Sequence, residues 1–137
     1  MPIPPLDEIQ STFAFLDSWE DRFQYVIDLG KQLPILPEHE KCEPNRVHGC
    51  QSSVWLVMEP ATDGTLFIRA TSDAFIVSGL IAILLAFYAG KTKAQILAAD
   101  APGFFKQLGL AEHLSPTRRN GLFSMIERVR ALAGAIQ

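Results

Sequence analysis

A single cysteine stands where a loop is expected to become a strand, in the segment EPNRVHGCQSSVWLVM, residues 43 to 58. The Gly, Gln and Ser residues around Cys50 are poor formers of strand and core, which predicts a turn that presents the thiol. A free thiol has a pKa of about 8.5, so only about one molecule in thirty is a nucleophilic thiolate at pH 7. Positive charge or a helix N-terminus nearby lowers that pKa. Arg46 and His48 are near in sequence. Cys50 could equally be a small apolar residue at the base of the loop, because cysteine is among the most buried residue types.

Metal binding is a second interpretation of the same segment. His39, Cys42, His48 and Cys50 place four zinc-competent side chains within twelve residues. Structural zinc sites usually pair ligands two to four residues apart, whereas one residue separates His48 from Cys50, so the spacing fits zinc poorly. A redox pair of Cys42 and Cys50 is a further alternative, although their gap is not the two residues of thioredoxin-type sites. By itself, Cys42 is expected to be an incidental loop thiol.

Two arginines lie where a helix tolerates them least. Arg118 and Arg119 follow Ser115-Pro116, an N-cap followed by a proline at the first helical position, so they fall in the first turn of the last helix. Each costs about a few tenths of a kcal/mol against the helix dipole. Such a conflict can mark a site that attracts an anion such as a thiolate. The alternative is that one or both pair with a carboxylate such as Glu112.

The surrounding pattern predicts the elements that must position these groups. Helical spacing indicates helices from Leu6 and after Ser18, followed by an irregular loop over residues 34 to 53. Residues 54 to 59 and 66 to 71 are predicted to form an antiparallel hairpin. Further helices are expected from Phe75 to before Gly90, over 93 to 98, from Ala101 to near Gly109, and from Pro116 to the end. Ser72 and Asp73 are the N-cap candidates of the Phe75 helix. Trp55 and Phe75 are expected in the core, and His113 at the surface.

Composition limits the class of protein. The chain has 137 residues, 48% of them hydrophobic and 20% charged, which is typical of one globular domain spanning residues 1 to 137. A net charge of −3 argues against a nucleic-acid binder. No signal peptide is recognisable, so a cytoplasmic location is expected, and the uncharged stretch 74 to 90 is too short to span a membrane. Helices before and after a small antiparallel sheet make the fold class α+β.

Four segments, in their order along the chain, carry a resemblance to a known family. SWEDRFQYVIDLGKQLP, NRVHGCQSSVWL, TSDAFIVSGLIAILL and LGLAEHLSPTRRNGLFSMIERVR together resemble the SufE family of sulfur-acceptor, or cysteine desulfuration, proteins over almost the whole chain. The most specific part is GCQS followed by VW, at a suitable distance from SDA and SPTR. The resemblance implies an α+β fold with helices packed on an antiparallel sheet, similar to iron–sulfur cluster scaffold proteins.

The resemblance also implies a function. A PLP-dependent cysteine desulfurase, SufS-type or related, would hold sulfur as a persulfide, and Cys50 would accept it for delivery to an iron–sulfur cluster scaffold complex. Asp73 and Arg118 match positions linked to the cysteine loop and the desulfurase contact. Together with His48, Gly49, Gln51 and Ser52 they form the expected loop and contact set, although Cys42 and His48 are not part of the family pattern. No metal, bound cofactor, nucleic acid or membrane is expected. The alternative function is a metal-binding or cluster-scaffold module using the His39 to Cys50 segment.

Overall fold

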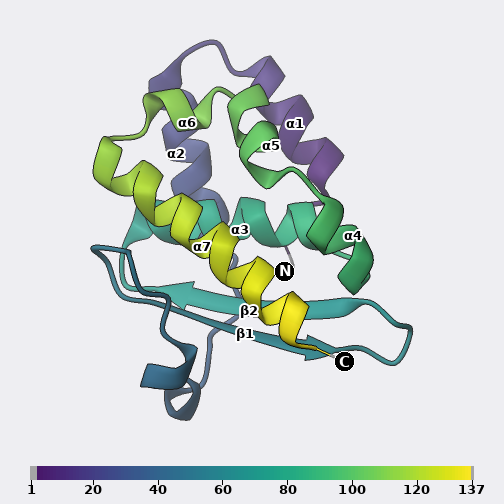
Figure 1. Cartoon of the computed structure of the whole chain (residues 1–137). Coiled ribbons are helices and arrows are strands. Elements are labelled where there is room, and N and C mark those ends of the chain that lie inside the picture. The colour runs from purple at the N-terminus through teal and green to yellow at the C-terminus, as the bar shows by residue number, and fades with distance from the viewer. Residues whose placement is uncertain (1–2, 137) are drawn as a thin grey trace.

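The computed structural model describes residues 3–136, which form helices above and in front of a two-stranded sheet (Figure 1). Two 3-10 turns interrupt the long loop that precedes the sheet. In chain order the elements are α1 (Leu6–Phe15), α2 (Trp19–Gly30), η1 (Glu38–Glu40), η2 (Glu43–Asn45), β1 (Val54–Pro60), β2 (Leu66–Ser72), α3 (Phe75–Tyr88), α4 (Lys93–Ala98), α5 (Ala101–Gln107), α6 (Leu110–His113) and α7 (Pro116–Ala135).

The sheet is an antiparallel hairpin. Val54 pairs with Ser72 at one end and Pro60 with Leu66 at the other. Along β2 the side chains of Leu66, Ile68 and Ala70 are buried while those between them are more exposed, the period-two pattern of a strand with one face on the core. An isolated bridge between Arg46 and Trp55 extends the sheet at β1, and the loop with Cys50 lies between these two pairing segments.

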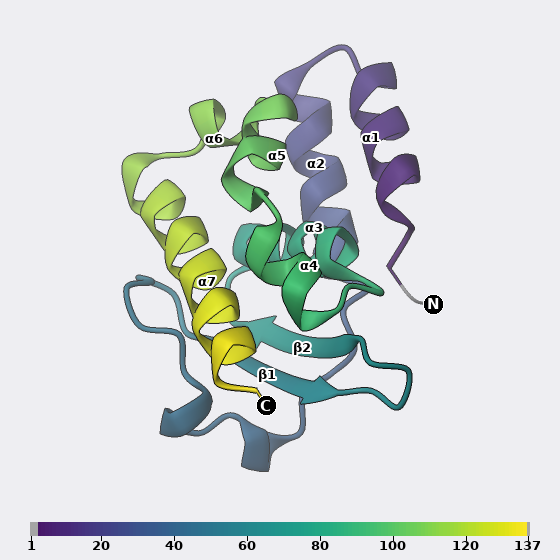
Figure 2. The same ribbon diagram turned by 45° about the vertical axis from the view of Figure 1, so that its right-hand side comes forward.

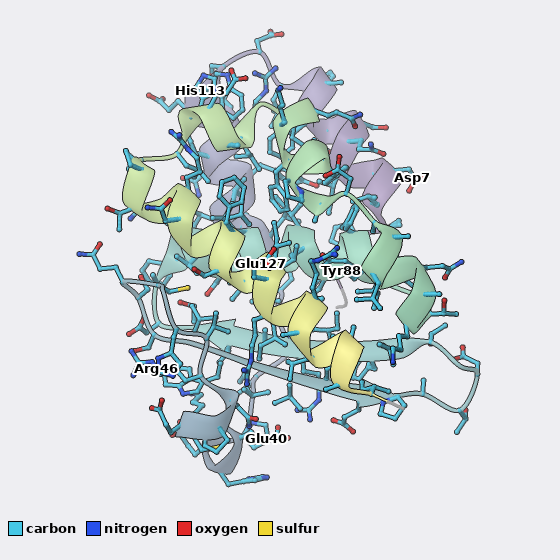
Figure 3. All side chains as sticks on the ribbon, in the orientation of Figure 1. Asp7, Glu40, Arg46, Tyr88, His113 and Glu127 are labelled. Carbon is cyan, nitrogen blue, oxygen red and sulfur yellow. The ribbon has the colours of Figure 1, made fainter. Side chains whose placement is uncertain are left out.

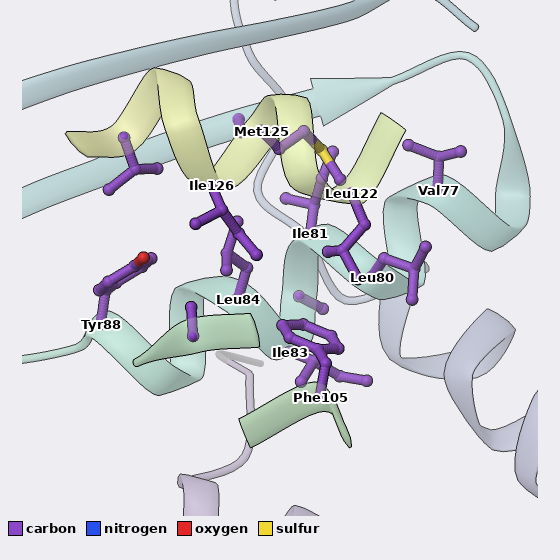
Figure 4. Packing of buried hydrophobic residues seen from close by; sticks show 14 of the residues in the cluster. Val77, Leu80, Ile81, Ile83, Leu84, Tyr88, Phe105, Leu122, Met125 and Ile126 are labelled. Atoms are coloured by element: carbon purple, nitrogen blue, oxygen red, sulfur yellow. The ribbon is translucent and has the colours of Figure 1, made fainter. Parts of the chain in front are cut away.

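The central element of the core is α3. It is apolar on nearly all sides and lies between the sheet on one side and α1 and α2 on the other (Figure 2). At Gly79 an added Cβ would collide with the backbone of Val26, so glycine there allows α2 and α3 to approach closely. On its other side α3 meets α7, where Leu80, Ile81 and Leu84 pack with Leu122, Met125 and Ile126 (Figure 4).

Most predicted elements are confirmed. The structure has the hairpin, the helix over 93–98, a helix that begins after Asp100, and a last helix that begins after Ser115. The Ser18 and Ser115 side chains each accept a backbone N–H as N-caps should. Gly90 follows the end of α3 with a positive φ of 72°. The short α6 and the two 3-10 turns were not predicted, because segments of three or four residues are too short to show a period.

Two local predictions were wrong. Phe75 is 76% exposed and not part of the core, because it is the first residue of α3 and points away from the face that Ile76 and Val77 bury. The N-cap residue of α3 is Ala74, which makes no side-chain cap, and Asp73 bonds elsewhere, as described below. Trp55 is partly buried and His113 is exposed. Among residues 3–136, no helix is both long and apolar enough to cross a membrane.

Candidate functional site

A small recess of about 70 Å³ opens beside Cys50. Three elements meet there: the loop before β1, the N-terminal half of α3 and the first turns of α7. The lining residues are Cys50, Gln51, Ser52, Val77, Leu80, Thr117, Arg118, Gly121, Leu122 and Met125. The Cys50 thiol thus has apolar side chains of α3 and α7 on its inner side and polar side chains at the protein surface.

The thiol is held by the backbone of α7. Cys50 is partly buried, and its Sγ donates a weak hydrogen bond to the carbonyl oxygen of Gly121 at 3.5 Å. A Cβ added at Gly121 would come within 3.6 Å of Sγ, so any larger residue there would narrow the recess. Glycine inside a helix costs roughly 1 kcal/mol relative to alanine, and at this position it leaves open the space beside the Cys50 sulfur.

Burial keeps the thiol protonated. Loss of solvation raises the pKa of Cys50 above its ordinary value, and the positive charge of Arg46 only partly offsets this. Arg46 lies on the segment that leads into the loop (Figure 3). The resting protein therefore stores Cys50 as a sheltered thiol, and a change in its surroundings is needed before most of it becomes a thiolate.

The loop is fixed at both ends. Gly49 has a φ of 90°, and an added Cβ would collide with the Ser124 side chain of α7, so both conformation and space require glycine. At the other end, the Asp73 carboxylate accepts the backbone N–H of Ser53 at 3.1 Å, and the Asp73 N–H donates to the Ser53 carbonyl at 3.3 Å. This explains why Asp73 does not cap α3: its side chain is used to hold the cysteine loop against β2.

The two arginines of α7 differ in their surroundings. Arg118 is exposed, lines the Cys50 recess, and donates its backbone N–H to the Ser115 hydroxyl at 3.3 Å. Arg119 is partly buried and donates to the Leu114 carbonyl at 3.4 Å. Within residues 3–136 neither guanidinium forms an ion pair, so the alternative of pairing with Glu112 is wrong.

The four zinc-competent side chains do not come together. His48 is exposed and lies 2.7 Å from the Glu43 carboxylate, while the Cys42 Sγ points to the Glu40 carbonyl at 3.7 Å. In the part of the chain that the structure describes, no three His, Cys, Asp or Glu side chains are arranged to hold a metal ion. The geometry gives no support to the alternative metal site built from His39, Cys42, His48 and Cys50.

The structure brings together only part of the predicted site. Gln51, Ser52 and Arg118 line the recess with Cys50, and Asp73 ties the loop from outside. His48 points away to Glu43, and Gly49 acts through its backbone. The contributions of Gly121 and Ser124 were missed. A glycine inside the amphipathic pattern of the last helix was an available signal for Gly121, whereas nothing local distinguishes Ser124.

This chain is similar to known proteins in its sequence and in its fold. The family model described as SufE, Fe-S metabolism associated domain, matches residues 7–133. An uncharacterized SufE-like protein of Rhizobium meliloti is 50% identical over 131 residues, covering 93% of this chain and 94% of the relative. One from Rhizobium etli is 49% identical over 128 residues, covering 91% and 86%. The solution structure of a hypothetical protein from Thermus thermophilus superposes with a TM-score of 0.76 at 25% identity, covering 98% of this chain and 96% of that one.

The fold is α+β and places the Cys50 thiol in a recess between α3 and α7, as expected of a small protein with a half-buried loop thiol at its candidate site. The chain belongs to the SufE family, and its role lies in iron–sulfur metabolism. The resemblance seen in the sequence is thereby confirmed.

Proposed function

We propose that the protein is a sulfur acceptor and carrier, which takes persulfide sulfur from a PLP-dependent cysteine desulfurase onto Cys50. The observation that carries the proposal is the position of the thiol: Cys50 lies at the surface end of a small, partly apolar recess and is held there by one weak hydrogen bond. A persulfide is sensitive to reductants and oxidants, so a carrier benefits from a recess that limits their access. Family membership supports the same function.

The transfer is a displacement at sulfur. The Cys50 thiolate attacks the outer sulfur of the desulfurase persulfide, so a bond forms between the Cys50 Sγ and that sulfur while the sulfur–sulfur bond of the donor breaks. The donor cysteine leaves as a thiolate and takes up the proton that Cys50 gives up. One thiol and one persulfide become one persulfide and one thiol, and no oxidant, reductant or cofactor bound to this chain is consumed.

The contacts around Cys50 give its neighbours separate tasks. Arg46 favours the thiolate by its charge. Asp73 and Gly49 fix the conformation of the loop, and Gln51, Ser52 and Arg118 provide polar side chains at the recess that a donor would contact. Removing sulfur from the donor would stimulate its turnover, and the loaded carrier would pass the sulfur on to an iron–sulfur cluster scaffold complex.

Intact-mass analysis tests this function. The protein is mixed with a SufS-type cysteine desulfurase and cysteine, and its mass is followed under non-reducing conditions. Wild type and Cys42→Ser should gain the mass of one or more sulfur atoms, while Cys50→Ser should gain none and should fail to stimulate the desulfurase. Persulfide confined to Cys42, or stimulation that survives in Cys50→Ser, would contradict the proposal. Stoichiometric metal in the purified protein would favour the metal-binding alternative instead.

A further inference from the structure

Phe75 is a large apolar side chain that the fold leaves in solvent. It is 76% exposed at the start of α3, two residues after Asp73, which ties the Cys50 loop to β2. Ile76 and Val77, the next two residues, are buried, so helix geometry directs Phe75 away from the core. Folding gains little from a phenyl ring in this position, and what distinguishes it from the other exposed rings is the surface beside it.

The surface beside this ring is hollowed. A depression of about 450 Å³ lies between α2, the start of α3 and the segment that enters α7. Phe23 and Ile27 of α2 and Leu114 provide apolar walls, and Phe75 stands at the rim. The depression is thus suited to receive an apolar side chain from another protein, with the phenyl ring packing against the same partner.

This depression adjoins the Cys50 recess. Arg118 lines both cavities and forms the boundary between them. A protein that delivers sulfur directly to Cys50 must cover the mouth of the recess, and so it also covers the protein surface next to that mouth. Arg118 has no carboxylate partner among residues 3–136, which leaves its charge free to meet the anionic persulfide or an acidic group of the donor.

We propose that Phe75 and the adjoining depression, lined by Phe23, Ile27 and Leu114, are the docking anchor for the cysteine desulfurase that loads Cys50. This inference rests on the proposed function and assigns to it a residue that touches neither the thiol nor the transferred sulfur. A second copy of this chain fits the surface less well, because it would close the mouth of the recess without bringing a sulfur donor. Phe75 acts on the affinity for the desulfurase, and Cys50 and its neighbours act on the transfer itself.

The chain offers a matched control. Phe15, at the end of α1, is 81% exposed but lines neither the Cys50 recess nor the depression. Phe15→Ala and Phe75→Ala remove the same group from equally solvated positions, so both should leave the fold intact. Only one of them should affect docking.

The test measures binding and transfer separately. A SufS-type cysteine desulfurase that wild type has been shown to stimulate is used with its persulfide-forming cysteine replaced by serine, and the Kd is measured by calorimetry. Phe75→Ala should raise the Kd by about tenfold or more, as for an interface anchor, while Phe15→Ala leaves it unchanged. With the active desulfurase at saturating concentration, Phe75→Ala should still load Cys50 at the wild-type rate. Its Cys50 should also react with iodoacetamide as in wild type, which shows that the recess is intact.

The possible outcomes separate the Phe75 docking anchor from the proposed sulfur-carrier function. An unchanged Kd for Phe75→Ala, in a wild type that accepts sulfur, overturns the docking anchor and leaves the carrier function standing. An equal loss for Phe15→Ala also overturns it, since the effect would then be general to exposed phenyl rings. Failure of wild-type Cys50 to accept sulfur overturns the proposed function itself.

Discussion

The Asp73 carboxylate accepts the backbone N–H of Ser53 at 3.1 Å and so ties the end of the Cys50 loop to the start of α3. Replacing Asp73 with alanine removes this bond, which is worth about 1 kcal/mol, and should raise the population of opened loops about fivefold. Cys50 then spends more time in water. We expect Asp73→Ala to react severalfold faster with iodoacetamide at pH 7, measured by the mass of the alkylated protein.

The hairpin turn provides the control for this experiment. The Asp63 carboxylate accepts both the backbone N–H of Thr65 at 3.1 Å and its hydroxyl at 2.6 Å, at the end of the sheet away from Cys50. Asp63→Ala should lose similar stability without any change in alkylation. Equal rates in the two variants and wild type would mean that the Asp73 bond does not restrain the loop.

Arg46 should set the reactivity of the thiol at a given pH. Its charge lowers the pKa of Cys50, opposing the larger upward effect of burial. In Arg46→Gln the thiolate loses this stabilisation, so the midpoint of alkylation rate against pH should move upward and the rate at pH 7 should fall. An unmoved midpoint would show that solvent screens the guanidinium from the sulfur.

The sequence predicted best those elements whose signals lie within one short segment. Ser115-Pro116 predicted the start of α7, and the segments 54 to 59 and 66 to 71 predicted the antiparallel hairpin. Phe75 was wrongly assigned to the core because apolar character shows that a residue can be buried but not that its position at a helix end faces inward. The capping role assigned to Asp73 failed for a related reason: Ser53, its actual partner, lies twenty residues away in the chain.

The site was predictable in part for the same reason. Cys50, Gln51 and Ser52 are adjacent, so the turn and its thiol could be found together, and Arg118 stood out by its conflict with the helix dipole. The bond from Cys50 to Gly121 joins residues 71 positions apart, and only packing of α7 against the loop creates it. The sequence also could not show that burial outweighs Arg46 in its effect on the pKa of Cys50, since this depends on the depth of the recess.

Tyr88 should weaken the fold at alkaline pH. Its side chain is 1% exposed, its hydroxyl has no hydrogen-bond partner among residues 3–136, and burial raises its pKa from 10.0 to about 12 (Figures 3 and 4). The pKa of Tyr88 is higher in the folded than in the unfolded state, so the unfolded chain ionises first as the pH rises. The free energy of unfolding is therefore unaffected below pH 10 and falls as the pH rises towards 12. The loss approaches about 2–3 kcal/mol.

Replacing Tyr88 with phenylalanine tests this. The variant keeps the ring and removes a hydroxyl that has been desolvated without a partner, so it should be about 1 kcal/mol more stable than wild type at pH 7. Its advantage should grow between pH 10 and 12, measured as the urea midpoint at each pH. A constant difference across this range would show that Tyr88 does not control the alkaline loss.

Arg118 should affect the affinity for the desulfurase and not the pKa of the Cys50 thiol. Its backbone N–H bond to Ser115 survives any side-chain change, and its removal relieves a conflict with the dipole of α7, so Arg118→Ala should be neutral or stabilising by about a few tenths of a kcal/mol. The charge that lowers the pKa of Cys50 belongs to Arg46, so the midpoint of alkylation against pH should stay where it is in wild type. Desulfurase affinity should fall, because the guanidinium lies between the recess and the Phe75 depression.

Arg130→Ala is the control for this prediction. It removes the same charge further along α7, where the side chain donates to the Leu97 carbonyl, and it should leave the affinity for the desulfurase unchanged. An upward shift of the alkylation midpoint in Arg118→Ala, with unchanged affinity, would instead place this guanidinium on the Cys50 thiolate.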